Sequence, residues 1–146
     1  IPVLTPTARA LGNAMQLTLI LRDVGEDWHS LGRVCLTADL MAAHGVTTAT
    51  LQAGRPTPAY QTLVESVMAE AERLYDEAEM GIEALPRRAQ AGIRAAARWY
   101  REILNEVRAS GYDNLRRRNV VPLGRKARRL VHDGYARRKR RLVMAG

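Results

Sequence analysis

The chain has 146 residues, and its hydrophobic fraction of 47% excludes an intrinsically disordered protein. No apolar run reaches the roughly 18 residues that a membrane-spanning helix needs. The net charge of +8 is uneven, because residues 1–82 carry −5 and residues 83–146 carry +13, and this asymmetry indicates an anionic partner for the second half.

Helical periodicity extends through most of the sequence, whereas the period-two alternation of β-strands is absent. The expected fold class is therefore all-α, with antiparallel helices in one domain over residues 1–146 and a basic tail from about residue 137. In chain order, the pattern predicts helices over residues 7–29, 37–43, 47–53, 57–85, 88–110 and 123–140.

Local signals set the boundaries of the predicted helices. Thr7 is a candidate N-cap of the first helix, and Thr57 is followed by Pro58 at the first position of the long one. Pro86 ends that helix, and Gly111 ends the next. Apolar residues recur every three to four positions in both, so each helix is expected to bury one face.

Two carboxylates lie near the end of the first predicted helix. Asp23 and Asp27 are four residues apart, which places both on one face, one turn apart, with Gln16 on roughly the same face. The preceding turns are apolar nearly all round, so this face is expected to be buried, where an unpaired carboxylate pair is costly. A divalent cation such as Mg²⁺ removes that cost. The alternative is a solvated helix end, with Arg22 and Arg33 as ion-pair partners.

The segment around these carboxylates resembles the second aspartate-rich motif of the squalene and phytoene synthase family. The similarity covers about residues 8–130 and is most specific at residues 20–27, which have the sequence ILRDVGED. Within the family, the similarity is to the C-terminal half of bacterial phytoene synthases. Shorter segments agree with the family in order and spacing: Gly32-Arg33-Val34, Glu79 to Pro86, Trp99 to Leu104, and Gly111 to Lys126.

The resemblance implies the isoprenoid synthase fold, of which this chain would form the C-terminal half of the helical bundle. It implies an Mg²⁺-dependent prenyl transferase that condenses two prenyl diphosphates head to head, here geranylgeranyl diphosphate to phytoene in carotenoid biosynthesis. Asp23 and Asp27 would be the catalytic residues and would ligate Mg²⁺, with Mn²⁺ as the alternative ion. The other candidate residues would bind the substrate: Gln16, Arg22, Arg33, Tyr100, Arg118 and Lys126.

Two departures from the family pattern bear on activity. Leu19 stands where the family usually has an asparagine that is expected to help ligate the metal. The first aspartate-rich motif would lie before Ile1, and no second DxxxD in the chain replaces it. We therefore expect a fragment that lacks the N-terminal half of the enzyme, needs that half as a partner and is inactive alone.

Three other functions stay open from the sequence. A squalene-type synthase would perform the same chemistry on farnesyl diphosphate, and a non-catalytic remnant would keep the fold without the activity. A basic helical nucleic-acid-binding module would explain the +13 half but not the acidic pair, so no nucleic acid is expected as a partner. The single Cys35 favours a reducing cytoplasm, and the basic tail would permit a peripheral contact with the inner face of the membrane.

Overall fold

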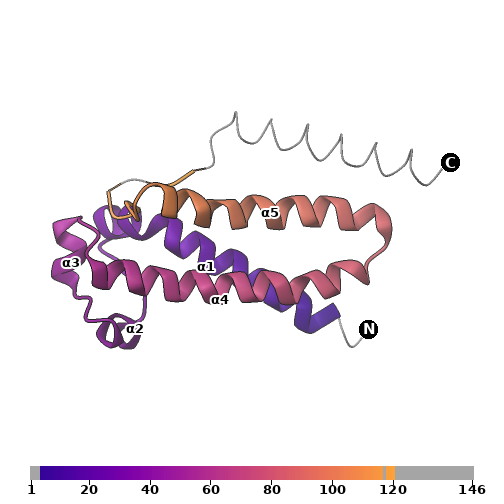
Figure 1. Ribbon diagram of the computed structural model, residues 1–146, viewed down its shortest axis with the longest axis horizontal. Helices are drawn as coiled ribbons and strands as arrows, with labels where there is room; N and C mark the ends of the chain where they lie inside the picture. Colours follow the sequence, from indigo (N-terminus) through magenta and orange to yellow (C-terminus); the bar gives the residue numbers. More distant parts are fainter. Residues whose placement is uncertain (1–3, 117, 121–146) are drawn as a thin grey trace.

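The computed structural model describes residues 4–116 and 118–120 (Figure 1). No strand occurs within these ranges, so the all-α prediction is confirmed there, and none of the described helices is long and apolar enough to cross a membrane. The helix predicted over 123–140 and the basic tail from about 137 lie outside the described residues. The helices are, in chain order, α1 (Leu4–Leu31), α2 (Ala38–Ala43), α3 (Thr48–Ala53), α4 (Pro58–Glu83) and α5 (Arg87–Ala109).

The start of α1 differs from the prediction. The helix begins at Leu4, so Thr7 is not its N-cap but lies within the helix, where its Oγ1 donates to the Leu4 carbonyl over 3.2 Å. Pro6 does not interrupt the helix, because N–H groups of the first turn have no partner within it. The start of α4 agrees with the sequence signals, since the Thr57 side chain accepts a hydrogen bond from Tyr60 N–H over 3.2 Å.

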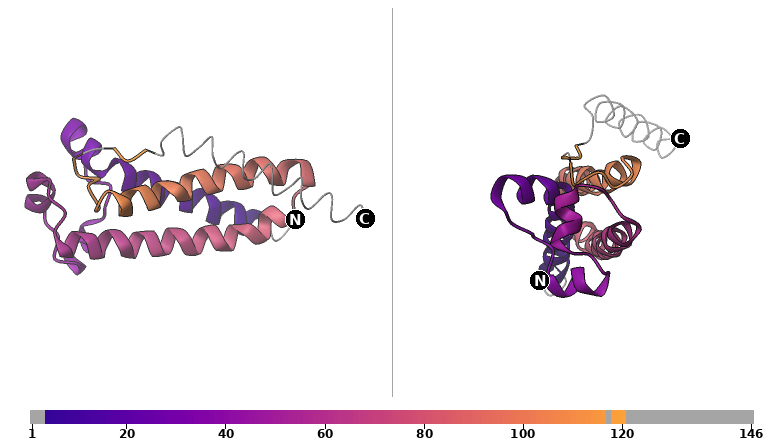
Figure 2. Two further views of the ribbon diagram at one scale, coloured as in Figure 1. Left: turned by 45° about the horizontal axis from the view of Figure 1, so that its top comes forward. Right: turned by 90° about the vertical axis from the view of Figure 1, so that its left-hand side faces the viewer.

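The three long helices lie side by side and form the body of the molecule (Figures 1 and 2). α4 and α5 are antiparallel, because only a short turn over residues 84–86 joins them. α1 packs along α4 and also contacts α5, while α2 and α3 lie at the end where α1 finishes and α4 begins (Figure 1). The core between the long helices is apolar, and its fully buried side chains include Leu21, Leu63, Met68 and Leu104.

Close contacts fix the position of α1 along α4. Gly81 of α4 lies so close to Thr7 that any Cβ at position 81 would overlap the threonine side chain. Further along the same pair of helices, Thr18 Oγ1 and Tyr75 OH form a buried hydrogen bond of 2.9 Å. Burial raises the pKa of Tyr75 to about 12, so this hydroxyl keeps its proton at neutral pH. The two contacts set where along α4 the end of α1 lies.

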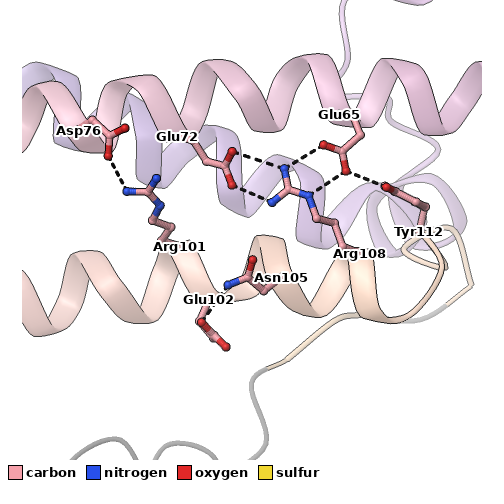
Figure 3. Close-up of polar contacts among 8 residues, drawn as sticks. All are labelled: Glu65, Glu72, Asp76, Arg101, Glu102, Asn105, Arg108 and Tyr112. Carbon is pink, nitrogen blue, oxygen red and sulfur yellow. Dashed lines mark hydrogen bonds and ion pairs between the residues drawn. The ribbon is translucent and has the colours of Figure 1, made fainter. Parts of the chain in front are cut away.

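Acidic residues of α4 face basic residues of α5 along one side of this helix pair (Figure 3). Arg108 binds two of them, with Nε 2.8 Å from Glu65 Oε1 and Nη1 2.7 Å from Glu72 Oε1. Arg101 Nη1 lies 2.7 Å from Asp76 Oδ1. The charge asymmetry of the sequence is therefore balanced in part within the chain, and by itself it indicates an anionic partner less strongly than the sequence suggested.

Candidate functional site

The last turns of α1 carry the acidic pair. Asp23 and Asp27 are one turn apart on the same face, and both residues are partly exposed, which corrects the expectation of a buried face. Asp23 forms a two-pronged pair with its neighbour, since Arg22 Nε donates to Oδ1 over 2.8 Å and Nη2 donates to Oδ2 over 2.7 Å. The hydrogen bond to Asp23 is the main cause of a raised pKa at Arg22, and partial burial opposes it. The charge of Asp23 is thus balanced within α1.

Arg118 reaches the same carboxylate from the segment that follows α5. Its Nε lies 2.9 Å from Asp23 Oδ1 and 3.4 Å from Glu26 Oε2. Asp23 therefore contacts two guanidinium groups, of which Arg22 is local and Arg118 is distant in sequence. Because guanidinium groups bind phosphate oxygens in the fork geometry that they use for carboxylates, these two arginines are suited to a diphosphate.

The loop after α1 folds back onto Asp27. Gly32 ends the helix with a φ of +60°, a conformation that favours glycine. The Cys35 thiol then donates to Asp27 Oδ2 over 3.3 Å, and the backbone N–H of Arg33 donates to the Asp27 carbonyl over 3.2 Å. The hydrogen bond to Asp27 raises the pKa of the Cys35 thiol, while Arg33 acts in the opposite direction. Arg33 itself is exposed.

The other predicted substrate ligands occupy different environments. Gln16 of α1 is exposed. Tyr100 of α5 is half-buried against the core. The pKa of Arg22 is raised mainly by the hydrogen bonds that it donates to Asp23, and Tyr100 makes a smaller electrostatic contribution in the same direction. Lys126 lies outside the described residues.

The carboxylate pair suits Mg²⁺ in its chemistry but does not enclose an ion. Within residues 4–116 and 118–120, no three His, Cys, Asp or Glu side chains converge as a metal site. Mg²⁺ commonly takes one or two carboxylates and completes its shell with water and substrate phosphate, which Asp23 and Asp27 could match. Leu19, one turn before Asp23, is partly exposed and offers no donor atom.

A buried asparagine behind the site escaped the sequence analysis. Asn114 is fully buried, its Nδ2 donates to the Leu21 carbonyl over 2.7 Å, and its Oδ1 accepts from Tyr60 OH over 3.0 Å. Gly25 N–H donates to the Asn114 carbonyl over 3.0 Å. The signal in the sequence was Gly25, because glycine within a helix costs about 1 kcal/mol relative to alanine and so calls for a structural reason.

Comparison with known proteins identifies relatives over most of the chain. The profile of the squalene/phytoene synthase family matches residues 2–125. The phytoene synthase of Thermus thermophilus is 51% identical over 108 residues, which are 74% of this chain and 37% of that protein. Phytoene synthase 2 of Solanum lycopersicum, a chloroplastic protein, is 40% identical over 114 residues, which are 78% of this chain and 36% of that protein. The chain thus spans little more than a third of the length of these relatives.

A solved structure shows the same fold. The crystal structure of a dehydrosqualene synthase in complex with ligand is similar to this chain with a TM-score of 0.79 and 38% sequence identity. The match covers 90% of this chain and 46% of that one. The predicted isoprenoid synthase fold is therefore confirmed, with the chain corresponding to part of the helical bundle.

Proposed function

The chain belongs to the squalene/phytoene synthase family, and on this premise we propose that it forms the C-terminal part of a prenyl transferase. The proposed reaction is the head-to-head condensation of two geranylgeranyl diphosphates to phytoene, a step of carotenoid biosynthesis. Identities of 51% and 40% to phytoene synthases support this substrate. Farnesyl diphosphate, the substrate of a squalene-type enzyme, is the alternative.

The observation that carries the proposal is the charged cluster at the end of α1. Arg22 and Arg118 both contact Asp23, one turn from Asp27, so two cations and two carboxylates lie together. In the proposed enzyme Asp23 and Asp27 hold Mg²⁺ or, alternatively, Mn²⁺. When bound, this ion neutralises charge that develops on the departing diphosphate.

The chain's own side chains would bind and orient the diphosphate. Arg22 is held by its two hydrogen bonds to Asp23, so its guanidinium is oriented before the substrate arrives. Arg118 adds a second guanidinium on the same carboxylate, and Tyr100 of α5 is proposed to contact the diphosphate beside them. Three further substrate ligands complete the proposal: Gln16, Arg33 and Lys126.

The proposed enzyme needs a second carboxylate helix, which carries the first aspartate-rich motif and faces α1 across the substrate. We expect that helix in an N-terminal part that acts as partner, and we expect residues 1–146 alone to be inactive. Leu19, which cannot ligate a metal, is the feature that would favour a non-catalytic remnant instead. The proposed location is cytoplasmic, with the basic tail against acidic lipid of the inner membrane face.

The test is a fusion of residues 1–146 to the part of the Thermus thermophilus phytoene synthase that precedes the matched region. With Mg²⁺ and geranylgeranyl diphosphate, the fusion should release phytoene and pyrophosphate, whereas residues 1–146 alone should release neither. Asp23→Asn or Asp27→Asn should lower kcat by roughly 100-fold or more. Asp76→Asn, the same change at an exposed carboxylate of α4, is the matched control and should leave kcat unchanged.

Each failure of this test has its own meaning. Turnover by residues 1–146 alone would contradict the need for a partner. A preference of the fusion for farnesyl diphosphate would replace the proposed substrate by that of a squalene-type enzyme. A fusion that folds but has no activity with either substrate would support the remnant.

A further inference from the structure

Asn114 forms hydrogen bonds with two backbone groups of α1, the Leu21 carbonyl and the Gly25 N–H. In an α-helix, the Leu21 carbonyl and the Gly25 N–H are the acceptor and donor of one i to i−4 pair. Here Asn114 Nδ2 donates to the Leu21 carbonyl over 2.7 Å, and Gly25 N–H donates to the Asn114 carbonyl over 3.0 Å. Asn114 thus contacts α1 just before and just after Asp23.

The backbone at Asn114 lies directly against α1. A Cβ at position 25 would overlap the Leu115 carbonyl and would lie 2.7 Å from the Asn114 carbonyl oxygen. Both Asn114 and Leu115 are almost completely buried, and Gly25 is buried as well. Only glycine at position 25 permits this approach, which explains a helix-weakening residue inside the acidic motif.

α4 holds the Asn114 segment from the other side. Tyr60 OH donates to Asn114 Oδ1 over 3.0 Å, and burial raises the pKa of this tyrosine. Tyr112, which has a left-handed φ of +63°, donates its hydroxyl to Glu65 Oε1 over 2.8 Å (Figure 3). The turn after α5 is therefore attached to α4 at two points before it crosses α1.

The same segment leads to the charged cluster. Arg118 follows Asn114 by one short stretch of chain, and its Nε lies 2.9 Å from Asp23 Oδ1. We propose that Asn114 is a positioning residue of the diphosphate site. It holds the Leu21–Gly25 turn of α1 and places Arg118 beside Asp23. The inference rests on the proposed function, because it assigns a role within that site.

The side-chain chemistry explains why an asparagine stands at this position. Its amide supplies one donor, to Leu21, and one acceptor, for Tyr60, at a place with no access to water. Leucine, whose side chain has the same branched arrangement of heavy atoms, would remove both hydrogen bonds, and a buried polar group that loses its partner is costly. Aspartate would keep the acceptor but place a negative charge against a carbonyl oxygen.

The test compares two buried tyrosines of α4. Tyr60→Phe removes the hydroxyl that holds Asn114, whereas Tyr75→Phe removes another buried hydroxyl, which bonds Thr18 instead. Binding of Mn²⁺ with inorganic pyrophosphate is measured by electron paramagnetic resonance, at a temperature where every variant is folded by circular dichroism. Tyr60→Phe should weaken binding at least threefold and Asn114→Leu at least tenfold, while Tyr75→Phe should stay within twofold of wild type.

Amide hydrogen exchange gives a second readout that needs no ligand. Exchange at Gly25 should accelerate at least tenfold in Tyr60→Phe, with little change at Thr18, and the reverse should hold in Tyr75→Phe. Unchanged Gly25 exchange in Tyr60→Phe, or equal loss of binding in both tyrosine variants, would overturn the positioning role. If residues 1–146 of wild type, fused to the N-terminal part, bind no Mn²⁺ with pyrophosphate, the proposed function is contradicted, and the exchange rates still decide the role of Asn114.

Discussion

Arg118 Nε lies 2.9 Å from Asp23 Oδ1, so a residue that follows the last described helix completes the ion-pair cluster of the first. Arg22 meets the same carboxylate from its neighbouring position in α1. The two cations differ in how they are held, because Arg22 is fixed by helix geometry and Arg118 depends on the packing of a distant segment. Changes that disturb the packing of the segment after α5 should therefore affect Arg118 but not Arg22.

Arg118→Gln should weaken the binding of Mg²⁺ with inorganic pyrophosphate, because it removes a guanidinium without touching the carboxylates. We expect a fivefold to tenfold loss, or about 1 to 1.4 kcal/mol, by isothermal titration calorimetry. The affinity of Arg118→Lys should lie between those of wild type and Arg118→Gln, since an ammonium group keeps the charge but not the fork geometry of the guanidinium. Arg73→Gln, at an exposed arginine of α4 that pairs with Glu70, is the control. Equal losses from Arg118→Gln and Arg73→Gln would contradict a local role.

Replacing each of two glycines in the long helices with alanine should change the free energy of unfolding in opposite directions. At Gly12 of α1 nothing lies near an added Cβ, so Gly12→Ala should raise the free energy of unfolding by up to about 1 kcal/mol. At Gly81 the added Cβ would overlap Thr7, so Gly81→Ala should lower it by about 1 to 3 kcal/mol. Urea unfolding followed by circular dichroism measures both. A gain in stability at both positions would show that α1 and α4 are not in close contact at Thr7.

The pairing of Glu65 should make stability depend on pH. Hydrogen bonds from Arg108 are the main cause that lowers the pKa of Glu65 below its ordinary value of 4.5. A lowered folded-state pKa stabilises the fold above the unfolded value, and this stabilisation is lost as the pH falls through the folded pKa. Glu65→Gln should therefore be less stable than wild type at pH 7, with a difference that shrinks below about pH 4.5.

The control is the Glu65→Gln change made in a protein that lacks Arg108. In an Arg108→Gln background, Glu65→Gln should alter the free energy of unfolding much less at pH 7, because the partner is gone. Thermal unfolding at a series of pH values measures the free energy of unfolding of all four proteins, which are wild type, the two single variants and the double variant. An undiminished effect in the double variant would mean that another partner stabilises the charged form of Glu65, such as the Tyr112 hydroxyl, which donates to it.

Leu19→Asn should strengthen the metal site. Position 19 lies one turn before Asp23 and is partly exposed, so an amide oxygen there could join the carboxylates as a ligand. We expect Mn²⁺ to bind at least threefold more tightly by electron paramagnetic resonance. Met80→Asn, which exchanges another exposed apolar side chain for asparagine on α4, should leave Mn²⁺ binding unchanged. If the two variants behave alike, position 19 does not face the metal.

Much of the helical structure could be predicted because its signals are local. The Thr57 side chain accepts from Tyr60 N–H, and Gly111 has the positive φ that closes a helix, both within a few residues of the boundary that they set. The start of α1 was the exception, because Thr7 resembled a cap but is buried against Gly81 instead. A capping signal and a packing contact cannot be told apart when only the sequence is known.

That Asp23 and Asp27 share one face of α1, with Arg22 beside them, could be predicted from the sequence, because these relations depend only on helix geometry. The contact of Arg118 with Asp23 and the exposure of Gln16 could not be predicted in this way, because both depend on how the helices pack. The contact of Asn114 with Leu21 joins residues 93 positions apart, and such a contact forms only once α4, α5 and the turn after α5 have packed against α1. Helix periodicity fixes which side chains share a face, but only packing between helices decides which of those faces is covered and which charges meet there.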